Sequence, residues 1–300
     1  MKISIIGNGA VGNMLAVSCH QQQLDYQVLT RSEQATELKV TDSNNKQWKM
    51  PLVVNPLSAL SHSDLIILPL KAYQIAEFIE QNQSLIHCKQ TLVLLHNGMG
   101  TIETCQQLLP NNNLIAGTTS YGAFKPDALT LHIKGKGDTH FGWISQQADC
   151  QHQAIEHVLS ALLPPSAWHK DIRLALWLKL AINAAINPLT ALYGVTNGEL
   201  RASHFQSQII EVCEEVNHVM NYLGFVQEPQ ALLQKVNKVI EDTADNFSSM
   251  NRDVAAKRPT EIDFINGYIV KQAQRCDLPC PVNLNLLKKI KTMETSYLPY

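Results

Sequence analysis

The feature that most constrains the fold of this chain is a glycine-rich turn at its start. An apolar run, Lys2–Ile6, leads into Gly7-Asn-Gly-Ala-Val-Gly12, and a helical stretch, Asn13–Gln23, follows. At the beginning of a βαβ unit, such glycines permit a tight turn, let the backbone approach a pyrophosphate and allow the helix to pack closely on the strand. Because the helix N-terminus also offers N–H groups to an anion, this position favours a dinucleotide site over an ordinary glycine turn. The predicted contacts are Gly7, Asn8, Gly9, Ala10, Val11 and Gly12.

The first half of the chain alternates short apolar runs with helical stretches, which is the pattern of parallel βαβ units. Strands are predicted at Lys2–Ile6, Tyr26–Thr30, Glu37–Thr41, Lys49–Val54, Asp64–Pro69, Thr91–His96 and Leu114–Thr119. The segment Leu129–Ile144 alternates and carries three glycines, so we expect it to form antiparallel strands at the end of the sheet.

The pattern changes after Pro164-Pro165, where the alternation ends and runs with a helical period begin. From residue 166 onward we expect only helices, near Ile172–Leu192, Glu199–Leu223, Glu228–Thr243, Thr260–Cys276 and Val282–Thr292. The expected fold class is α/β, with an N-terminal Rossmann-type doubly wound sheet followed by an all-helical C-terminal domain. We place the nucleotide-binding domain at residues 1–165 and the helical substrate-binding and catalytic domain at residues 166–300, with a ligand cleft expected between them.

The composition of the 300-residue chain favours a small-molecule partner. Its 24 basic and 26 acidic side chains give a net charge of −2 without long runs, so neither nucleic acid nor an anionic membrane is predicted to bind. The N-terminal apolar run is shorter than that of a signal peptide, and polar residues interrupt every stretch before the roughly 20 residues of a membrane helix. Seven scattered cysteines suit free thiols in the cytoplasm. Cys276 and Cys280 lack the second pair of a zinc site, so no metal is predicted.

Three polar residues follow predicted strands, at the edge where such sheets bind ligands. The second strand leads into Arg31, at a position where an NAD-preferring site usually carries Asp or Glu. Arg31 can pair with a 2′-phosphate, which favours NADPH, although a solvated loop arginine is the alternative. Lys71 and Asn97 come just after two further strands and are expected to face the same crevice. His96 is as consistent with a structural role as with a catalytic one, so it is not assigned to the site.

A polar stripe interrupts the apolar helical stretch Trp177–Pro188. Lys179, Asn183 and Asn187 recur every four residues, which places an ammonium and two amides on one helix face. Burial without partners costs about 1–3 kcal/mol for each amide and more for the ammonium. Reduction of a ketone by hydride needs a proton donor, a role that Lys179 fits, while the asparagines could hydrogen-bond a small polar substrate. In the alternative the asparagines cross-link helices and Lys179 reaches solvent, but three groups in register favour the site.

A second group of polar residues follows near the C-terminal end of the chain. Thr260 and Asp263 have the spacing of a capping box, so Glu261 could merely complement the dipole of a helix that opens at Thr260. A carboxylate close to Lys179 would instead orient the ammonium and bind a substrate hydroxyl. Ser249 could cap a helix or bind a carboxylate. Spacing alone leaves both questions open.

Taken together, these motifs resemble the ketopantoate reductase family over nearly the whole chain. The residues that carry the resemblance are Gly7-Asn-Gly-Ala-Val-Gly12, Lys71, His96-Asn-Gly-Met-Gly100, Lys179-Leu-Ala-Ile-Asn183-Ala-Ala-Ile-Asn187-Pro-Leu-Thr190, Asn197-Gly-Glu-Leu200, Ser248-Ser-Met250 and Thr260-Glu-Ile-Asp-Phe-Ile-Asn-Gly267. The motifs of the second half are far more specific than the glycine turn, because they keep residue types, order and spacing in two separated blocks. The segment Tyr121–His140 matches less clearly.

The resemblance implies NADPH-dependent reduction of the C2 ketone of 2-dehydropantoate to (R)-pantoate, a step that feeds pantothenate and coenzyme A synthesis. It implies that Lys179 is the acid at the C2 oxygen and that Glu261 binds substrate and interacts with this lysine. The implied substrate-binding residues are Asn183, Asn187, Asn197, Asn246 and Ser249, and the implied cofactor residues beyond the glycine turn are Arg31, Lys71 and Asn97. A reductase of another small 2-keto acid and a non-catalytic NADPH-binding sensor are the alternatives. Both a monomer and a homodimer are compatible with the sequence.

Overall fold

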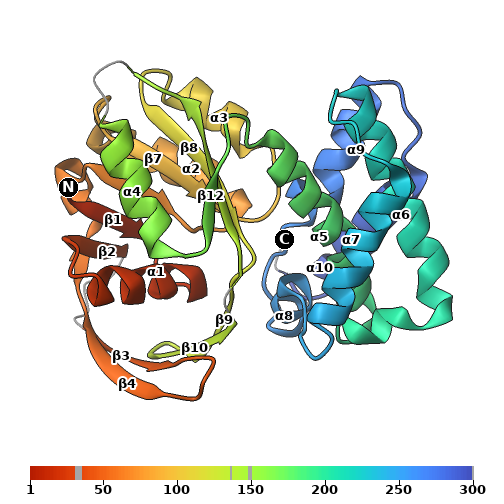
Figure 1. Cartoon of the computed structure of the whole chain (residues 1–300). Coiled ribbons are helices and arrows are strands. Elements are labelled where there is room, and N and C mark those ends of the chain that lie inside the picture. The colour runs from red at the N-terminus through yellow and green to blue at the C-terminus, as the bar shows by residue number, and fades with distance from the viewer. Residues whose placement is uncertain (31–35, 136, 148–150, 299–300) are drawn as a thin grey trace. The chain divides into compact units, whose positions relative to one another are not determined.

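The computed structural model describes residues 1–30, 36–135, 137–147 and 151–298. The chain divides into two compact units (Figure 1). The first unit comprises Met1–His96 and Thr101–Ile172, and the second comprises Asn97–Gly100 and Arg173–Tyr300. The division thus falls seven residues later than the expected boundary at residue 165, and a four-residue loop from the first half belongs to the second unit.

An eight-stranded sheet forms the centre of the first unit. Its strands are β1 (Ile3–Ile6), β2 (Tyr26–Thr30), β5 (Val54–Pro56), β6 (Leu65–Leu68), β7 (Thr91–Leu95), β8 (Asn113–Thr119), β11 (Thr139–Ser145) and β12 (Ser166–Trp168). They lie in the order β12-β11-β8-β7-β6-β1-β2-β5, and the six strands from β8 to β5 are parallel. This is the strand order of a doubly wound dinucleotide-binding fold, so the predicted fold class is confirmed for this unit.

Helices cover both faces of this sheet, and the strands alternate apolar side chains between two cores. On one face, Leu65 and Ile67 of β6 pack in a core with α1 (Ala10–Gln21) and α4 (His152–Leu162). On the other, Ile66 and Leu68 pack with α2 (Ala72–Asn82), α3 (Thr101–Leu108) and the short helices η1 (Leu57–His62) and η2 (Gln83–Leu85). Because both faces are buried, the strands read as continuous apolar runs, which is why the sequence located them well.

A smaller four-stranded sheet, in the order β4-β3-β10-β9, accompanies the first. It consists of β3 (Thr36–Thr41), β4 (Gln47–Leu52), β9 (Gly122–Asp127) and β10 (Thr130–Gly135). The expectation that Leu129–Ile144 lies wholly at the end of the main sheet was therefore wrong for its first half. Strand β11 does pair antiparallel with β8, but β10 pairs with β9 and β3. The choice is a tertiary one, since Leu131 of β10 joins the core on the α1 face.

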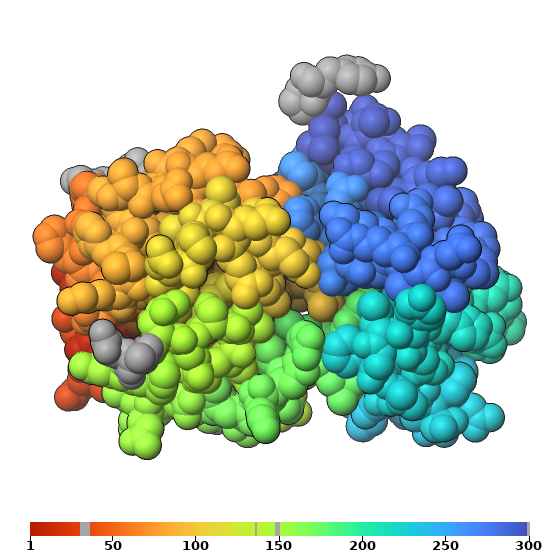
Figure 2. All heavy atoms as spheres, turned by 90° about the horizontal axis from the view of Figure 1, so that it is seen from above, coloured from red at the N-terminus to blue at the C-terminus, as the bar shows by residue number. Residues whose placement is uncertain are grey.

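The second unit is helical and forms one continuous body of atoms, coloured green to blue after residue 173 in Figure 2. Its elements are α5 (Arg173–Tyr193), η3 (Gly198–Arg201), α6 (Ser203–Tyr222), α7 (Pro229–Asp242), α8 (Ser249–Ala255), η4 (Ile262–Phe264), α9 (Asn266–Arg275) and α10 (Pro281–Thr295). Helix α5 contacts α6, α7, α8 and α10. It is long and apolar enough to cross a membrane by length and composition, but 72% of its most apolar window is buried in the protein, as in a core helix.

Three elements after residue 165 differ from the sequence-based expectation. Residues Ser166–Trp168 form strand β12, paired with β11, so the chain is not purely helical from residue 166 and this segment stays with the first unit. Helix α8 was not predicted, because seven residues are too few to show a period. The helix expected over Thr260–Cys276 is divided into η4 and α9, which begins only at Asn266.

Candidate active site

The glycine turn of the first unit has the geometry that a dinucleotide requires. Gly7 has a φ of +85°, which L side chains rarely adopt. A Cβ on Gly12 would collide with the carbonyl oxygen of Gly7, whereas a Cβ on Gly9 would meet no atom within 4 Å. Gly12 thus allows the helix to sit against the turn, and Gly9 presents an open backbone. Helix α1 begins at Ala10 with no acidic residue in its first turn, so its N-terminus is suited to phosphate.

Lys125 is a cation beside this turn that sequence reasoning missed. It lies on β9 of the smaller sheet, and its Nζ donates to the carbonyl oxygen of Asn8 at 2.7 Å. Burial lowers the pKa of Lys125, and the nearby Asp127 carboxylate opposes that shift. The contact joins residues 117 positions apart, so no local sequence pattern predicts it. Lys125 also lies in Tyr121–His140, the segment that resembles the family least clearly. A cation and helix N–H groups at one turn fit a pyrophosphate.

The other predicted cofactor residues are placed to different extents. Arg31 lies outside the residues that the structure describes. Lys71 follows β6 and immediately precedes α2, where its backbone N–H donates to Gln74 Oε1 at 3.1 Å. In the parallel sheet, β6 adjoins β1, so the position of Lys71 is at the same edge as the glycine turn.

The loop Asn97–Gly100 contacts a second-half segment within the second unit. Met99 N–H donates to the carbonyl oxygen of Phe264 at 2.8 Å, and a Cβ on Gly98, whose φ is +84°, would lie 2.6 Å from the same oxygen. Asn97 Nδ2 lies 3.5 Å from Glu261 Oε2, and Glu261 is only 3% exposed. The structure therefore brings together two motifs that are about 160 residues apart in the sequence, and with them two predicted site residues.

Hydrogen bonds among the described residues do not account for all the polar groups of the stripe on α5. Asn183 and Asn187 are 7% and 6% exposed, and Asn183 Nδ2 is buried with no hydrogen-bond partner among the described residues. Lys179 is half-buried, and the described part of the chain provides its ammonium with neither a hydrogen bond nor an ion pair. Burial lowers the pKa of Lys179. No group among the described residues pairs with the Asn183 amide nitrogen, so the structure shows no cross-link to another helix through this atom.

Helix α8 packs on the C-terminal half of α5 and fixes the position of Ser249. Thr190 Oγ1 lies 2.7 Å from Ser248 Oγ, and Asn251 Nδ2 donates to the Thr190 carbonyl oxygen at 2.6 Å. The hydroxyl of Ser248 accepts the N–H of Asn251 at 3.1 Å and so caps α8. The open question about Ser249 is answered in part, because Ser248 is the cap and the Ser249 side chain is exposed.

Asn197 and Asn246 lie next to each other at the start of η3. Asn197 N–H donates to the Asn246 carbonyl oxygen at 2.9 Å, and Asn197 Nδ2 donates to Thr243 Oγ1 at 2.8 Å. The Oδ1 of Asn197 is buried without a hydrogen-bond partner in the described structure, whereas the Asn246 side chain is exposed. Asn197 therefore resembles Asn183 in keeping one polar atom for a partner outside the described chain.

The capping box, one of the two alternatives that the spacing of Thr260 and Asp263 left open, is not formed. Thr260 Oγ1 accepts the N–H of Ile262 at 3.3 Å, and Asp263 is ion-paired with Lys291 at 2.9 Å. The segment continues as the 3₁₀ turn η4 rather than as an α-helix. The buried Glu261 carboxylate is consequently not explained as a dipole partner at the first turn of an α-helix.

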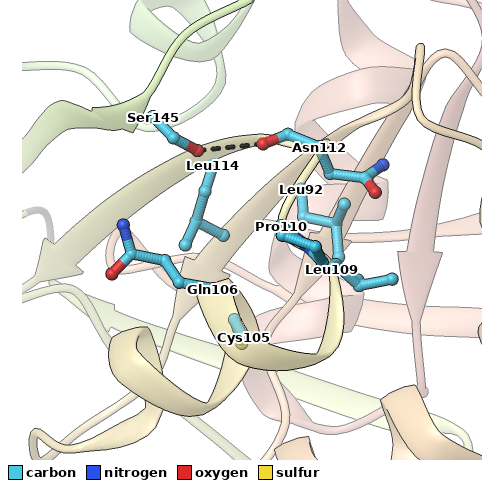
Figure 3. A pocket seen from close by; sticks show the side chains of 8 residues that line it. All are labelled: Leu92, Cys105, Gln106, Leu109, Pro110, Asn112, Leu114 and Ser145. Atoms are coloured by element: carbon cyan, nitrogen blue, oxygen red, sulfur yellow. Dashed lines mark hydrogen bonds between the residues drawn. The ribbon is translucent and has the colours of Figure 1, made fainter.

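Two pockets lie in the described part of the chain, and one of them is lined by the sequence neighbours of Asn197 and Asn246. The first, in the first unit, has a volume of about 90 Å³, and among its lining residues Ser145 Oγ donates to the Asn112 carbonyl oxygen (Figure 3). Since drug-sized ligands occupy pockets of about 300–1,000 Å³, it is too small for a dinucleotide. The second, of about 700 Å³, lies at the junction of α5, η3 and α6 and borders Gly198, next to Asn197.

Comparisons with known proteins bear on the family and the fold of the chain. Two models of the ketopantoate reductase PanE/ApbA family match the chain, over residues 3–146 and, for its C-terminal part, residues 171–294. The chain is 35% identical over 298 residues to a 2-dehydropantoate 2-reductase of Shigella flexneri, covering 99% of this chain and 96% of the relative. Among solved structures, it is similar to a D-mandelate dehydrogenase with NADH and anilino(oxo)acetate, with a TM-score of 0.91, 22% identity and 99% coverage of both chains. It is also similar to a dimeric ketopantoate reductase from Staphylococcus aureus, with a TM-score of 0.85, 19% identity, and coverage of 99% and 100%. The chain therefore belongs to the ketopantoate reductase PanE/ApbA family of nicotinamide-dependent oxidoreductases.

Proposed function

We propose that this protein is a 2-dehydropantoate 2-reductase that uses NADPH to reduce the C2 ketone of 2-dehydropantoate to (R)-pantoate, in the synthesis of pantothenate and coenzyme A. The observation that carries the proposal is the stripe on α5, where a half-buried ammonium and a buried amide lack partners within the described chain. The 35% identity to a 2-dehydropantoate 2-reductase over nearly the full length supports this choice of substrate.

In this proposal Lys179 donates the proton. Negative charge develops on the C2 oxygen during reduction, and the ammonium both stabilises that charge and delivers the proton that forms the hydroxyl. Burial lowers the pKa of Lys179 toward neutral pH, so the ammonium gives up its proton more easily. Glu261, buried beside Asn97, orients the substrate and the lysine.

The remaining polar residues of the second unit bind the substrate. Asn183 and Asn187 hydrogen-bond its hydroxyl and carboxylate oxygens from the face of α5. Further donors and acceptors come from Asn197 just before η3, Asn246 between α7 and α8, and Ser249 at the start of α8.

NADPH fits the groups that the first unit offers. When bound, it supplies the hydride and leaves as the oxidised nicotinamide. Gly7–Gly12 and the N-terminus of α1 bind the pyrophosphate, Arg31 pairs with the 2′-phosphate, and Lys71 contacts phosphate or ribose oxygens. Asn97 would contact the nicotinamide of the bound cofactor. The first unit, which extends to Ile172, is thus the proposed NADPH-binding domain, and the second unit, with Arg173–Tyr300, is the proposed substrate-binding and catalytic domain.

A second candidate is a reductase of another 2-keto acid. The fold similarity to D-mandelate dehydrogenase, with a TM-score of 0.91, favours it, because that protein is named for another 2-hydroxy acid and its structure holds anilino(oxo)acetate. A non-catalytic NADPH-binding sensor is the third possibility, and the presence of Lys179 together with Glu261 argues against it.

For the setting of the reaction we propose the cytoplasm and a small-molecule substrate, with neither nucleic acid nor membrane as a partner. The net charge of −2 supports this. A homodimer is as compatible as a monomer, since a dimeric reductase shares the fold.

The test is the oxidation of NADPH by the purified protein with 2-dehydropantoate, phenylglyoxylate and a panel of aliphatic 2-keto acids. We expect kcat/KM to be highest with 2-dehydropantoate. A higher kcat/KM with another keto acid would identify that acid as the substrate in place of 2-dehydropantoate. If the protein binds NADPH but reduces none of these acids, the non-catalytic sensor would be the supported function.

A further inference from the structure

A proline interrupts the hydrogen bonding of α5 at the turn that carries the two asparagines of the stripe. Pro188 lies inside the helix and directly follows Asn187. Because proline has no backbone N–H, the carbonyl oxygen four residues earlier, that of Ala184, loses its usual helical donor. Ala184 is fully buried and directly follows Asn183, so water does not replace that donor.

Asn266, the first residue of α9, supplies the missing donor. Its Nδ2 donates to the Ala184 carbonyl oxygen at 3.2 Å and to Asn283 Oδ1 at 2.9 Å. The Asn266 side chain is fully buried, and its Oδ1 has no hydrogen-bond partner in the described structure. Both N–H donors of the Asn266 amide are thus hydrogen-bonded, while its oxygen is not. This indicates that the role of Asn266 is to donate hydrogen bonds.

The direction of this contact is fixed by a buried carboxylate further along. Asn283 Nδ2 donates to Glu215 Oε2 at 2.7 Å, and the same carboxylate accepts the backbone N–H groups of Val282 and Asn283 at 2.7 and 2.9 Å. Since the carboxylate accepts, Asn283 turns its amide nitrogen toward Glu215 and its oxygen toward Asn266. Asn266 must then present its nitrogen to both Asn283 and Ala184.

We propose that Glu215, Asn283 and Asn266 are positioning residues, which hold the turn of α5 bearing Asn183 and Asn187 in the orientation that binds substrate. This rests on the proposed function of the stripe. Three helices, α6, α10 and α9, contribute one residue each, so the turn is tied to the frame of the second unit. We call the hydrogen bonds from Glu215 through Asn283 and Asn266 to the Ala184 carbonyl oxygen the relay. Because Pro188 has no backbone N–H, this oxygen depends on the relay for its donor; in a helix without proline, the backbone itself would supply the donor.

A double-mutant cycle tests the proposal in the full-length protein. Asn266→Ala leaves the Ala184 carbonyl oxygen without a donor, whereas Pro188→Ala restores the backbone N–H that would bond to it. In the wild-type background, Asn266→Ala should lower Tm by about 3 °C or more. It should also raise KM for the keto acid about tenfold, the factor that about 1.4 kcal/mol produces, with Kd for NADPH unchanged. In the Pro188→Ala background both effects should fall by at least half.

A matched control is available in the first unit. Asn82 is also a buried asparagine whose Nδ2 donates to a backbone carbonyl oxygen, that of Phe78, at 2.8 Å. The effects of Asn82→Ala and Pro188→Ala on Tm should simply add, and Asn82→Ala should leave KM for the keto acid unchanged.

The outcomes separate this proposal from the proposed function. Equal losses of Tm in both backgrounds, or a Tm effect without a KM effect, would overturn the positioning role. If Asn266→Ala does not fold alone, folding of the double variant supports the relay, and failure of both overturns it. If no 2-keto acid is reduced by the wild type, the proposed function fails, while the Tm cycle still reports on the Ala184 carbonyl.

Discussion

The glycine turn of the first unit and the polar stripe of α5 offer polar groups to ligands in opposite ways. In the turn the groups are backbone N–H donors at the N-terminus of α1, and the open backbone at Gly9 lets a ligand approach them. On α5 they are side chains, and their positions depend on contacts with distant segments such as α8 and α9. A run of consecutive residues specifies the first kind of site, whereas the second kind forms only when the tertiary structure brings distant residues together.

This difference has an energetic counterpart. At the glycine turn Asn8 and Gly9 are exposed, although the Asn13 side chain directly after the turn is buried without a hydrogen-bond partner among the described residues. The stripe and its surroundings keep Asn183 Nδ2 and Asn197 Oδ1 buried without hydrogen-bond partners in the described part of the chain. Each such atom costs about 1–3 kcal/mol of folding free energy until a ligand binds it. We therefore expect substitutions of the stripe asparagines to change activity without lowering stability. In the turn, the effect on stability should depend on whether a new Cβ has room, as at Gly9, or meets the backbone, as at Gly12.

The largest expected effect is that of Lys179→Ala. Loss of the proton donor should lower kcat with 2-dehydropantoate by about 10²–10⁴-fold, the range for general acid catalysis. Since the lysine is not part of the nucleotide turn, Kd for NADPH, measured by fluorescence titration, should change less than twofold. Near-normal turnover of the variant would show that Lys179 is not the proton donor.

The turn can be tested with a pair of glycine substitutions. Gly12→Ala places a Cβ against the Gly7 carbonyl oxygen, so it should cost about 1–3 kcal/mol of stability by overpacking and weaken NADPH binding as well. Gly9→Ala meets no atom within 4 Å, so it should leave Tm nearly unchanged and affect only Kd for NADPH. Thermal unfolding and NADPH titration measure both; equal losses of Tm would show that close packing does not distinguish the two positions.

The pH dependence of kcat should report on Lys179. The protonated lysine is the active acid, so kcat should fall as the pH rises through its pKa, by up to tenfold per pH unit. Because burial lowers that pKa, the fall should begin below the ordinary lysine value of about 10.4. In Lys179→Arg, whose guanidinium stays protonated, any residual activity should lack this limb. A limb that persists in the arginine variant would assign it to another group.

The smallest effect is expected at Lys125. Its loss removes one cation from the phosphate-binding turn, so Lys125→Ala should raise Kd for NADPH about five- to tenfold, less at high salt. Lys134→Ala is the control on the neighbouring strand, where the Lys134 ammonium lies 5.3 Å from the centre of the Phe124 ring. If both variants bind NADPH equally well, Lys125 takes no part in the site.

The sequence predicted most of the fold and named candidate site residues, but it did not predict the contacts that place their side chains. Strands such as β6 were predicted because burial on both faces gives an unbroken apolar run. Strand β10 was misplaced and β12 was missed, because pairing partners are tertiary choices that three to six residues do not encode. The contact of Lys125 with Asn8 and that of Asn266 with Ala184 span 117 and 82 residues, and no local pattern predicts either.

The central claim is that the stripe on α5 is kept for a ligand and not for internal structure. The most direct test is the free energy of unfolding of Asn183→Leu without ligands, measured alongside its kcat/KM for 2-dehydropantoate. Because Asn183 Nδ2 has no partner among the described residues, we predict that stability is unchanged or higher while kcat/KM falls about tenfold or more. A loss of about 1–3 kcal/mol of stability with normal kcat/KM would contradict the claim and make Asn183 a structural residue.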